Sequence, residues 1–249
     1  MNRQTLVLWD IDRTLLYVGN TDRRVYQDAF AQVVGRPAEH LPSRGTGTTM
    51  PLAVQELLRR NNVPTAEVAT LSAQVLARLP ELLSGRGTEM LADGHLLPGA
   101  KAALKAVHDS PDLVATVVTG NLQRNAEIKL ETFGLTGLVQ ADIGGYASDD
   151  SYRPALVAVA QGRAQAKHGA AFDRANTVII GDSLEDVRTG MQGGAAVIGV
   201  ASGTTTAEEL RMAGADAVLE SLVDSHLLLR TIRELVHGGT AQTQESRRP

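Results

Sequence analysis

The sequence predicts an α/β fold, a doubly wound parallel sheet with an α-helical domain inserted after the first strand. Three observations indicate this fold. Short, nearly continuous apolar runs recur along the chain, as is typical of strands buried on both faces of a parallel sheet. Segments with helical spacing alternate with these runs and mostly end at glycine, a common helix stop. Residues 18–94 break the alternation, because they contain helical segments and no convincing strand.

The predicted strands are residues 6–9, 113–118, 138–143, 178–180, 195–200 and, with a weaker pattern, 217–219. The helices expected between them are residues 100–107, 125–133, 154–167, 185–192 and 208–213. Within the insert, helical spacing covers residues 22–34, 51–60 and 66–83. We therefore expect a core domain formed by residues 1–17 and 95–237, a helical domain at 18–94, and a disordered polar tail at 238–249.

The composition excludes several classes of protein. The chain has 249 residues, of which 43% are hydrophobic and 21% charged, and a net charge of −4 without a concentrated basic block, so we expect no nucleic-acid partner. No run approaches the roughly 18 apolar residues of a membrane span, and the N-terminus does not resemble a signal peptide. Without cysteine there are no disulfides or thiolate ligands, which fits a cytoplasmic protein. The oligomeric state is not predicted.

Polar side chains follow several of the predicted strands. Asp10 and Asp12 end the first strand and point the same way if the extended geometry continues through them. Thr119-Gly120-Asn121 follows the second strand, and Asp182 and Asp186 follow the fourth. Arg153 lies between these two motifs in the sequence. Because the carboxyl ends of parallel strands share one edge of the sheet, these groups are expected to converge there.

Such a set of groups favours phosphoryl transfer. Clustered carboxylates without cysteine or histidine indicate a hard cation, and Mg²⁺ prefers oxygen ligands. A carboxylate beside Mg²⁺ can attack phosphorus, and a second carboxylate two residues on can protonate the leaving oxygen. A hydroxyl, the amides of a turn and an arginine would bind the phosphoryl oxygens.

The motifs Asp10-Ile-Asp12-Arg-Thr14, Thr119-Gly-Asn, Arg153-Pro and Gly181-Asp182-x-x-x-Asp186, in this order, resemble those of the haloacid dehalogenase superfamily. The resemblance covers residues 5 to about 236 and is nearest to the phosphoglycolate phosphatase-like branch. It implies the strand order 5-4-1-2-3, and it makes the insert similar to that branch's helical cap. The interval between Asn121 and Arg153 is too short for the larger type of cap.

The resemblance also implies roles for individual residues. Asp10 would be the nucleophile and a metal ligand, and Asp12 the general acid and base, with its backbone carbonyl on the metal. Thr14 would support this loop. Asp182 would bind Mg²⁺ directly, and Asp186 directly or through water. The phosphate would be held by Thr119, Gly120, Asn121 and Arg153.

The chain departs from the family pattern at two positions. Arg13 stands where glycine is common, so the turn is less pliant or its side chain points toward the cap. Arg153 stands where lysine is usual; arginine keeps the charge and offers a planar fork. Lys167 is the rival cation, but it lies at the far end of a predicted helix.

Two further assignments are left open by the sequence. The stretch at 43–50, "SRGTGTTM", is either a plain connection between cap helices or the loop that reaches the substrate, with Arg44 and Thr46 as the expected contacts. Asp186 could instead be an acid at a helix N-terminus, stabilised by the helix dipole.

The leading hypothesis is a Mg²⁺-dependent phosphomonoester hydrolase acting on a small phosphorylated metabolite through an aspartyl-phosphate. A phosphomutase and a catalytically silent phosphate-ligand-binding protein are the alternatives. A dehalogenase is disfavoured because Asp12 is present, and a phosphonate hydrolase because the insert contains no lysine. A receiver-type signalling domain is disfavoured by the order of the motifs.

Overall fold

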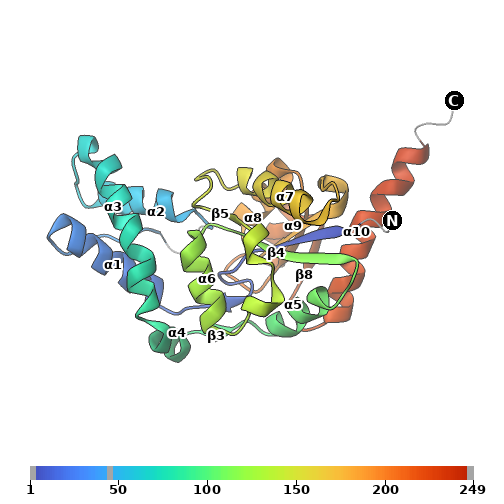
Figure 1. The fold of residues 1–249 in the computed structure, drawn as a ribbon, viewed down its shortest axis with the longest axis horizontal. Helices are drawn as coiled ribbons and strands as arrows, with labels where there is room; N and C mark the ends of the chain where they lie inside the picture. Colours follow the sequence, from blue (N-terminus) through green and yellow to red (C-terminus); the bar gives the residue numbers. More distant parts are fainter. Residues whose placement is uncertain (1–3, 44–46, 246–249) are drawn as a thin grey trace.

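A six-stranded parallel sheet forms the centre of the molecule in a computed structural model that describes residues 4–43 and 47–245 (Figure 1). The strand order is β5-β4-β1-β6-β7-β8, with every neighbouring pair parallel. The strands are β1 (Thr5–Trp9), β4 (Leu113–Thr119), β5 (Gly145–Tyr146), β6 (Thr177–Gly181), β7 (Ala196–Val200) and β8 (Ala217–Leu219). The predicted α/β class and strand order are confirmed, and β8 adds an edge strand beside β7.

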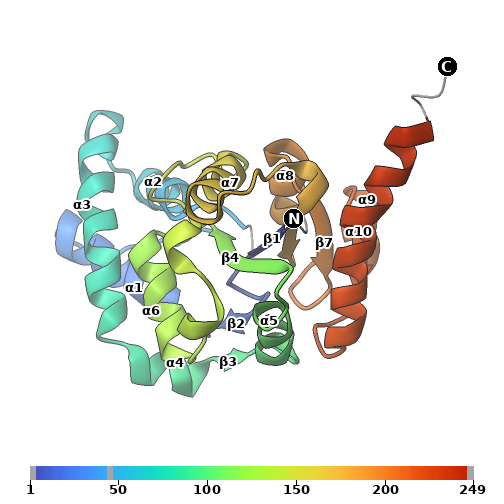
Figure 2. The same ribbon diagram turned by 45° about the vertical axis from the view of Figure 1, so that its right-hand side comes forward.

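Helices cover both faces of this sheet (Figure 2). On one face, Val7 and Trp9 of β1 share a buried cluster with residues of α5, α6 and α10. On the other, Leu6 and Leu8 pack with residues of α7, α8 and α9. The helices are α5 (Ala100–His108), α6 (Gln123–Thr132), α7 (Ala155–His168), α8 (Leu184–Gly193), α9 (Ala207–Met212) and α10 (Ser225–Glu245). The continuous apolar run of β1 is thus explained by burial on both sides.

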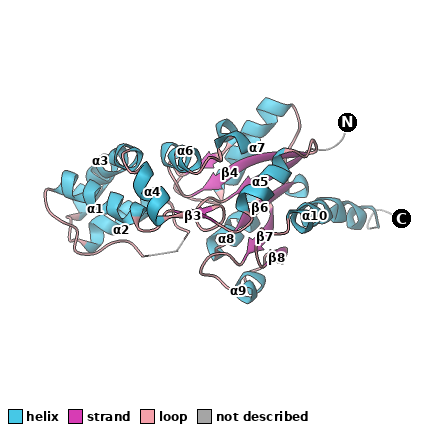
Figure 3. Ribbon diagram, turned by 90° about the horizontal axis from the view of Figure 1, so that it is seen from below, coloured by secondary structure: helices cyan, strands magenta, loops and turns pink. Residues whose placement is uncertain are grey.

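Four further helices lie at one end of the molecule, opposite α10 (Figure 3). They are α1 (Thr21–Val34), α2 (Met50–Arg60), α3 (Thr65–Ser84) and α4 (Gly87–Asp93). α1 and α2 both pack on α3, and α3 also contacts α6 of the core. The chain leaves and re-enters the core through a small antiparallel pair, β2 (Leu16–Tyr17) and β3 (His95–Leu96). None of the described helices is long and apolar enough to cross a bilayer.

One predicted strand is wrong. Residues 138–143 fall mainly in two short 3-10 helices, Thr136–Leu138 and Ala141–Ile143, and the strand beside β4 is Gly145–Tyr146. A short apolar run cannot separate a strand from other buried structure by periodicity. A Cβ atom on Gly145 would lie 2.3 Å from the Leu156 carbonyl oxygen, so close packing on α7 requires glycine there, against its low strand propensity.

Other differences concern helices. α4 and α10 have no counterparts among the helices expected from the sequence. α10 continues to Glu245, so residues 238–245 are helical where the sequence predicts a disordered tail, and residues 246–249 lie outside the described part of the chain. Extending an existing helix adds one hydrogen bond per residue and needs no new nucleus, so it does not require an apolar continuation.

The side chain of Asn61, at the end of α2, holds the connection between α1 and α2. This side chain is 2% exposed; its Nδ2 donates to the carbonyls of His40 and Leu57, both at 2.7 Å, and its Oδ1 accepts from the amides of Glu39 and His40.

Asn61→Ala should lower the free energy of unfolding by about 3 kcal/mol, because buried partners are left unsatisfied. Urea unfolding measures this change. Arg59→Ala is the control, because the Arg59 side chain makes an exposed contact with Gln55. Its free energy of unfolding should differ from that of the native chain by less than about 0.5 kcal/mol. Equal losses in both variants would contradict the prediction.

Candidate active site

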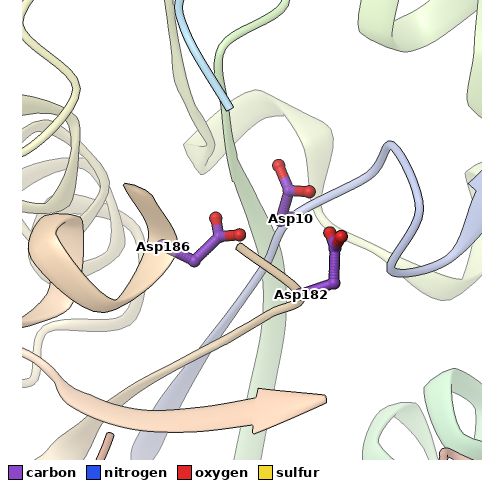
Figure 4. Close-up of side chains that lie close together, drawn as sticks. All are labelled: Asp10, Asp182 and Asp186. Atoms are coloured by element: carbon purple, nitrogen blue, oxygen red, sulfur yellow. The ribbon is translucent and has the colours of Figure 1, made fainter. Parts of the chain in front are cut away.

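Three buried carboxylates converge at the carboxyl end of the sheet (Figure 4). Asp10 follows β1, Asp182 follows β6, and Asp186 lies in the first turn of α8. One oxygen of each lies within 4.8 Å of the others. Their exposed fractions are only 6%, 3% and 1%, so little water screens the repulsion between them.

The local chain conformation holds these carboxylates in place. The hydroxyl of Thr14 donates to Asp182 Oδ1 at 3.0 Å. Asp186 Oδ2 accepts from the amide and the hydroxyl of Ser183, at 2.9 and 2.6 Å, in a capping box that starts α8. A Cβ atom on Gly203 would lie 1.7 Å from Asp182 Oδ2, so glycine is required where that loop passes the site. Asp186 therefore acts as a helix-start acid and is also part of the cluster.

In the described part of the chain, the cation that contacts this cluster is Arg153. Its side chain is 3% exposed, and its Nη2 donates to Asp10 Oδ1 at 2.6 Å and also to Asp186. Its Nη1 donates to the carbonyl of Gly47 at 2.8 Å. Lys167, the rival cation, instead pairs with Asp142 at 2.7 Å on the surface. The structure thus brings Arg153, and not Lys167, to the carboxylates.

The proton affinities of these groups reflect burial and mutual repulsion. Burial raises the pKa of Asp10 well above its usual range, Asp186 raises it further, and Arg153 opposes this shift. Burial, followed by repulsion from Asp186, raises the pKa of Asp182 to about 7. For Arg153, burial disfavours the charged form, but attraction by Asp186 and Asp10 outweighs it and the pKa is raised.

The three carboxylates suit a divalent cation. Arg153 supplies one positive charge within hydrogen-bonding distance of the cluster, against three buried carboxylates. A buried, uncompensated carboxylate is costly, as the raised pKa values of Asp10 and Asp182 indicate. All the candidate metal ligands are carboxylate oxygens, which hard cations such as Mg²⁺ prefer.

The second aspartate of the first motif has different surroundings. Asp12 is 36% exposed in its side chain, and its Oδ2 accepts from Nδ2 of Asn121 at 2.7 Å. The same Nδ2 lies 2.8 Å from Oγ1 of Thr119, which is 1% exposed. Gly120 lies between them, and a Cβ atom there would come within 2.7 Å of the Thr48 carbonyl oxygen. The Thr-Gly-Asn turn therefore meets Asp12 on one side and the insert on the other.

Sequence reasoning missed Lys129. This fully buried lysine of α6 donates to both carboxylate oxygens of Asp12, at 2.8 and 2.9 Å, and to Asp22 at 2.8 Å. Burial alone would lower the pKa of Lys129, but attraction by Asp12 and Asp22 raises it. A signal was present, because Lys129 falls on the apolar stripe of its helix with Ala126 and Phe133.

A cavity of about 210 Å³ is lined by predicted site residues. Its core side includes Asp10, Asp12, Arg153 and Asp182, and its other side consists of insert residues such as Tyr26. On the core side the lining also includes Thr119, Gly120 and Asn121. The cavity is therefore enclosed jointly by the two parts of the chain.

The connection between α1 and α2 reaches this cavity. Gly47 and Thr48 line it, the amide of Met50 donates to the Gly120 carbonyl at 2.8 Å, and Thr49 Oγ1 donates to the Ser151 carbonyl at 3.0 Å. This part of the stretch 43–50 is thus more than a plain connection. Arg44 and Thr46, the expected substrate contacts, lie outside the described residues.

Arg13 adopts a left-handed conformation, with a φ angle of 68°. Glycine is favoured there because other residues are strained in this region. The Arg13 guanidinium lies 5.0 Å from the ring centroid of Tyr17, and both residues line the cavity. The side chain of Arg13 thus lies beside Tyr17 of β2 at the cavity.

Comparisons with known proteins agree with this geometry. A sequence model for haloacid dehalogenase-like hydrolases matches residues 7–190. The chain belongs to this family. A search of curated proteins finds no match to this haloacid dehalogenase-like hydrolase.

Solved structures share the fold along nearly their whole length. A hydrolase from Pseudomonas syringae is 23% identical, with a TM-score of 0.62 over 92% of this chain and 99% of that one. A predicted phosphatase from Clostridium acetobutylicum is 18% identical, with a TM-score of 0.63 over 92% and 99%. A candidate beta-phosphoglucomutase from Bacteroides vulgatus is 18% identical, with a TM-score of 0.61 over 94% and 91%. At these identities the likeness supports the fold.

The raised pKa of Asp182 gives this haloacid dehalogenase-like hydrolase a testable pH dependence. With a folded-state pKa of about 7 against an ordinary value of 3.8, Asp182 binds its proton more tightly when folded. Its contribution to stability is then fully present below about pH 4 and is lost as the pH rises through about 7. The expected change is in the free energy of unfolding of Asp182→Asn minus that of the native chain. In EDTA-treated protein, this difference should increase by on the order of 2–4 kcal/mol between pH 4 and 8.

Urea unfolding at a series of pH values measures this difference. Asp142→Asn is the matched control, because Asp142 is an aspartate in a solvent-exposed pair with Lys167. That variant should show no such growth with pH. A difference between Asp182→Asn and the native chain that stays constant across the range would contradict the assignment.

Proposed function

We propose that this chain is a Mg²⁺-dependent phosphomonoester hydrolase that acts through an aspartyl-phosphate. The observation that carries the proposal is the different environment of the two aspartates of the first motif. Asp10 lies among the acid cluster beside Arg153, whereas Asp12 lies beside Lys129 and Asn121. Both carboxylates face one cavity, but different partners hold them. This arrangement suits two separate roles, one as the nucleophile and the other as the acid–base group.

The reaction follows from these positions. A carboxylate oxygen of Asp10 attacks the phosphorus of the substrate, and the bond from phosphorus to the ester oxygen breaks. Asp12 donates a proton to that oxygen, and the alcohol departs. Asp12, now ionised, accepts a proton from water, which attacks the phosphorus and releases Asp10 and inorganic phosphate. The proton first given by Asp12 is thereby restored.

Thr119, Gly120, Asn121 and Arg153 supply the groups for the transferring phosphoryl oxygens. Thr119 offers a hydroxyl, and the turn after β4 offers backbone amides at the edge of the cavity. Arg153 brings a permanent positive charge against Asp10, which places it near the phosphorus during attack. Donors fixed in this way stabilise developing charge without reorganising.

Asp10, Asp182 and Asp186, with the backbone carbonyl of Asp12, would hold the Mg²⁺ ion. When bound, the ion neutralises negative charge on the transferring phosphoryl group and on the cluster itself. The protein contributes the rigid placement of the three carboxylates through Thr14, Ser183 and Arg153. Arg153 bridges Asp10 and Asp186 through its Nη2 atom.

The helical insert would serve as a cap. Gly47 and Thr48 from the insert line the cavity beside Arg153 and Gly120, and Tyr17 and Tyr26 add aromatic surface. A cavity of about 210 Å³ suits a small phosphorylated metabolite. The cap would exclude bulk water during the first step, and its opening would release the product alcohol.

Release of inorganic phosphate tests the proposal directly. A panel of small phosphomonoesters should yield phosphate with Mg²⁺ and none with EDTA. Asp10→Asn should lower the rate at least about a thousandfold, because it removes the nucleophile. Asp142→Asn, remote from the cavity and in a surface ion pair, should keep the native rate. Colorimetric phosphate release measures all four conditions.

The same assay discriminates the two alternatives. A phosphomutase would return the phosphoryl group to the substrate, so phosphorus NMR would show an isomerised ester and little inorganic phosphate. A silent binding protein would bind phosphomonoesters without releasing phosphate or forming an acyl phosphate. Either outcome in well-folded, Mg²⁺-loaded protein would contradict the hydrolase.

Metal binding has a readout that is independent of activity. At pH 8, saturating MgCl₂ should raise the melting temperature by several degrees, because the ion binds only the folded cluster. Asp182→Asn should abolish most of this shift, since it removes a carboxylate oxygen from the site. Asp142→Asn should retain it. An equal shift in all three proteins would indicate a nonspecific effect of the salt.

A further inference from the structure

One fully buried cation has no part in the reaction described above. Lys129 of α6 has no solvent-exposed surface, and lysine is almost never so deeply buried unless it is paired. Its ammonium group contacts Asp12, Asp22 and the Oδ1 atom of Asn121, all at 2.8–2.9 Å. These contacts are with four oxygen atoms, because both carboxylate oxygens of Asp12 take part, and an ammonium group has three N–H donors, so its full capacity is used.

The contacts are arranged around one side chain. Lys129 bonds to both carboxylate oxygens of Asp12, and Asn121 donates to Oδ2 of the same carboxylate at 2.7 Å. Asn121 is in turn held by Lys129 through its Oδ1. Asp12 thus has a fixed orientation, although more than a third of its side-chain surface is exposed.

Lys129 does not itself line the cavity, whereas Asp12, Asn121 and Asp22 do. It can therefore act on a bound substrate only through these neighbours. Two of them, Asp12 and Asn121, follow core strands, and Asp22 lies on α1 of the insert. The ammonium group joins the two parts of the chain at the point where the acid–base carboxylate stands.

We propose that Lys129 is a positioning residue that fixes the Asp12 carboxylate against the substrate's leaving oxygen. This role rests on the proposed hydrolase function. Asp22 completes the arrangement, because it also accepts from Nζ of Lys129 and so anchors the ammonium group from the insert side. The rival explanation is a buried ion cluster that stabilises the fold and has no specific effect on Asp12.

The test compares two phosphomonoesters with different leaving groups. An alkyl phosphate releases a poor leaving group that needs a proton from Asp12, whereas p-nitrophenyl phosphate releases a stable anion that hardly needs one. Lys129→Met removes the charge and keeps an unbranched chain. In this variant, kcat/KM for the alkyl ester should fall about 100-fold, and for the nitrophenyl ester less than about tenfold.

Asp12→Asn supplies the second arm. If Lys129 acts through Asp12, adding Lys129→Met to Asp12→Asn should cause no further loss of kcat/KM for the alkyl ester. Equal losses on both esters, or a further loss of similar size in the Asp12→Asn background, would overturn the positioning role. Failure of the native chain to release phosphate would overturn the hydrolase function itself, and the role of Lys129 with it.

Two variants control for effects on folding. If Lys129→Met does not fold, Lys129→Met/Asp22→Asn removes one charge of each sign and should show the same selective loss. Lys105→Met removes a lysine that is 64% exposed and paired with Asp109, and should leave both rates unchanged.

Discussion

The burial of Asp10, Asp182 and Asp186 within 4.8 Å of one another is the constraint on which the rest of the site depends. Three carboxylates at such distances repel strongly where water is excluded. Arg153 offsets part of this repulsion, and the remaining negative charge suits the divalent cation that we propose for this site. The cost of burying the cluster and its proposed affinity for a metal would then have the same electrostatic origin.

The parallel sheet makes this concentration of charge possible. Adjacent strands β1 and β6 run in the same direction, so the residues that follow them emerge at one edge. Close approach is then possible because glycine, which has no side chain, lies beside the carboxylates: Gly203 beside Asp182 and Gly181 beside Asp186. Ser183 and Thr14 supply donors where the carboxylates need them. The fold thus provides convergence, and small residues provide the short distances.

The insert completes the site from the opposite side. Gly47 accepts a hydrogen bond from Arg153, and Asp22 accepts one from Lys129, so both buried cations of the site bond to core carboxylates and to the insert at once. The first contact links the insert to the cation beside Asp10, and the second links it to the cation beside Asp12. Movement of the insert would therefore change the surroundings of both Asp10 and Asp12.

The sequence by itself determined the α/β class and the residues of the acid cluster, because both depend on local patterns: apolar runs, helix stops and polar residues at strand ends. The strand order came instead from the resemblance of the motifs to those of the family. Position in the sequence also favoured Arg153 over Lys167. Only the tertiary structure decided that residues 138–143 are not a strand and that Lys129 pairs with Asp12. These last features depend on close contacts between segments distant in sequence, here Gly145 with α7 and α6 with the loop after β1, which no local pattern encodes.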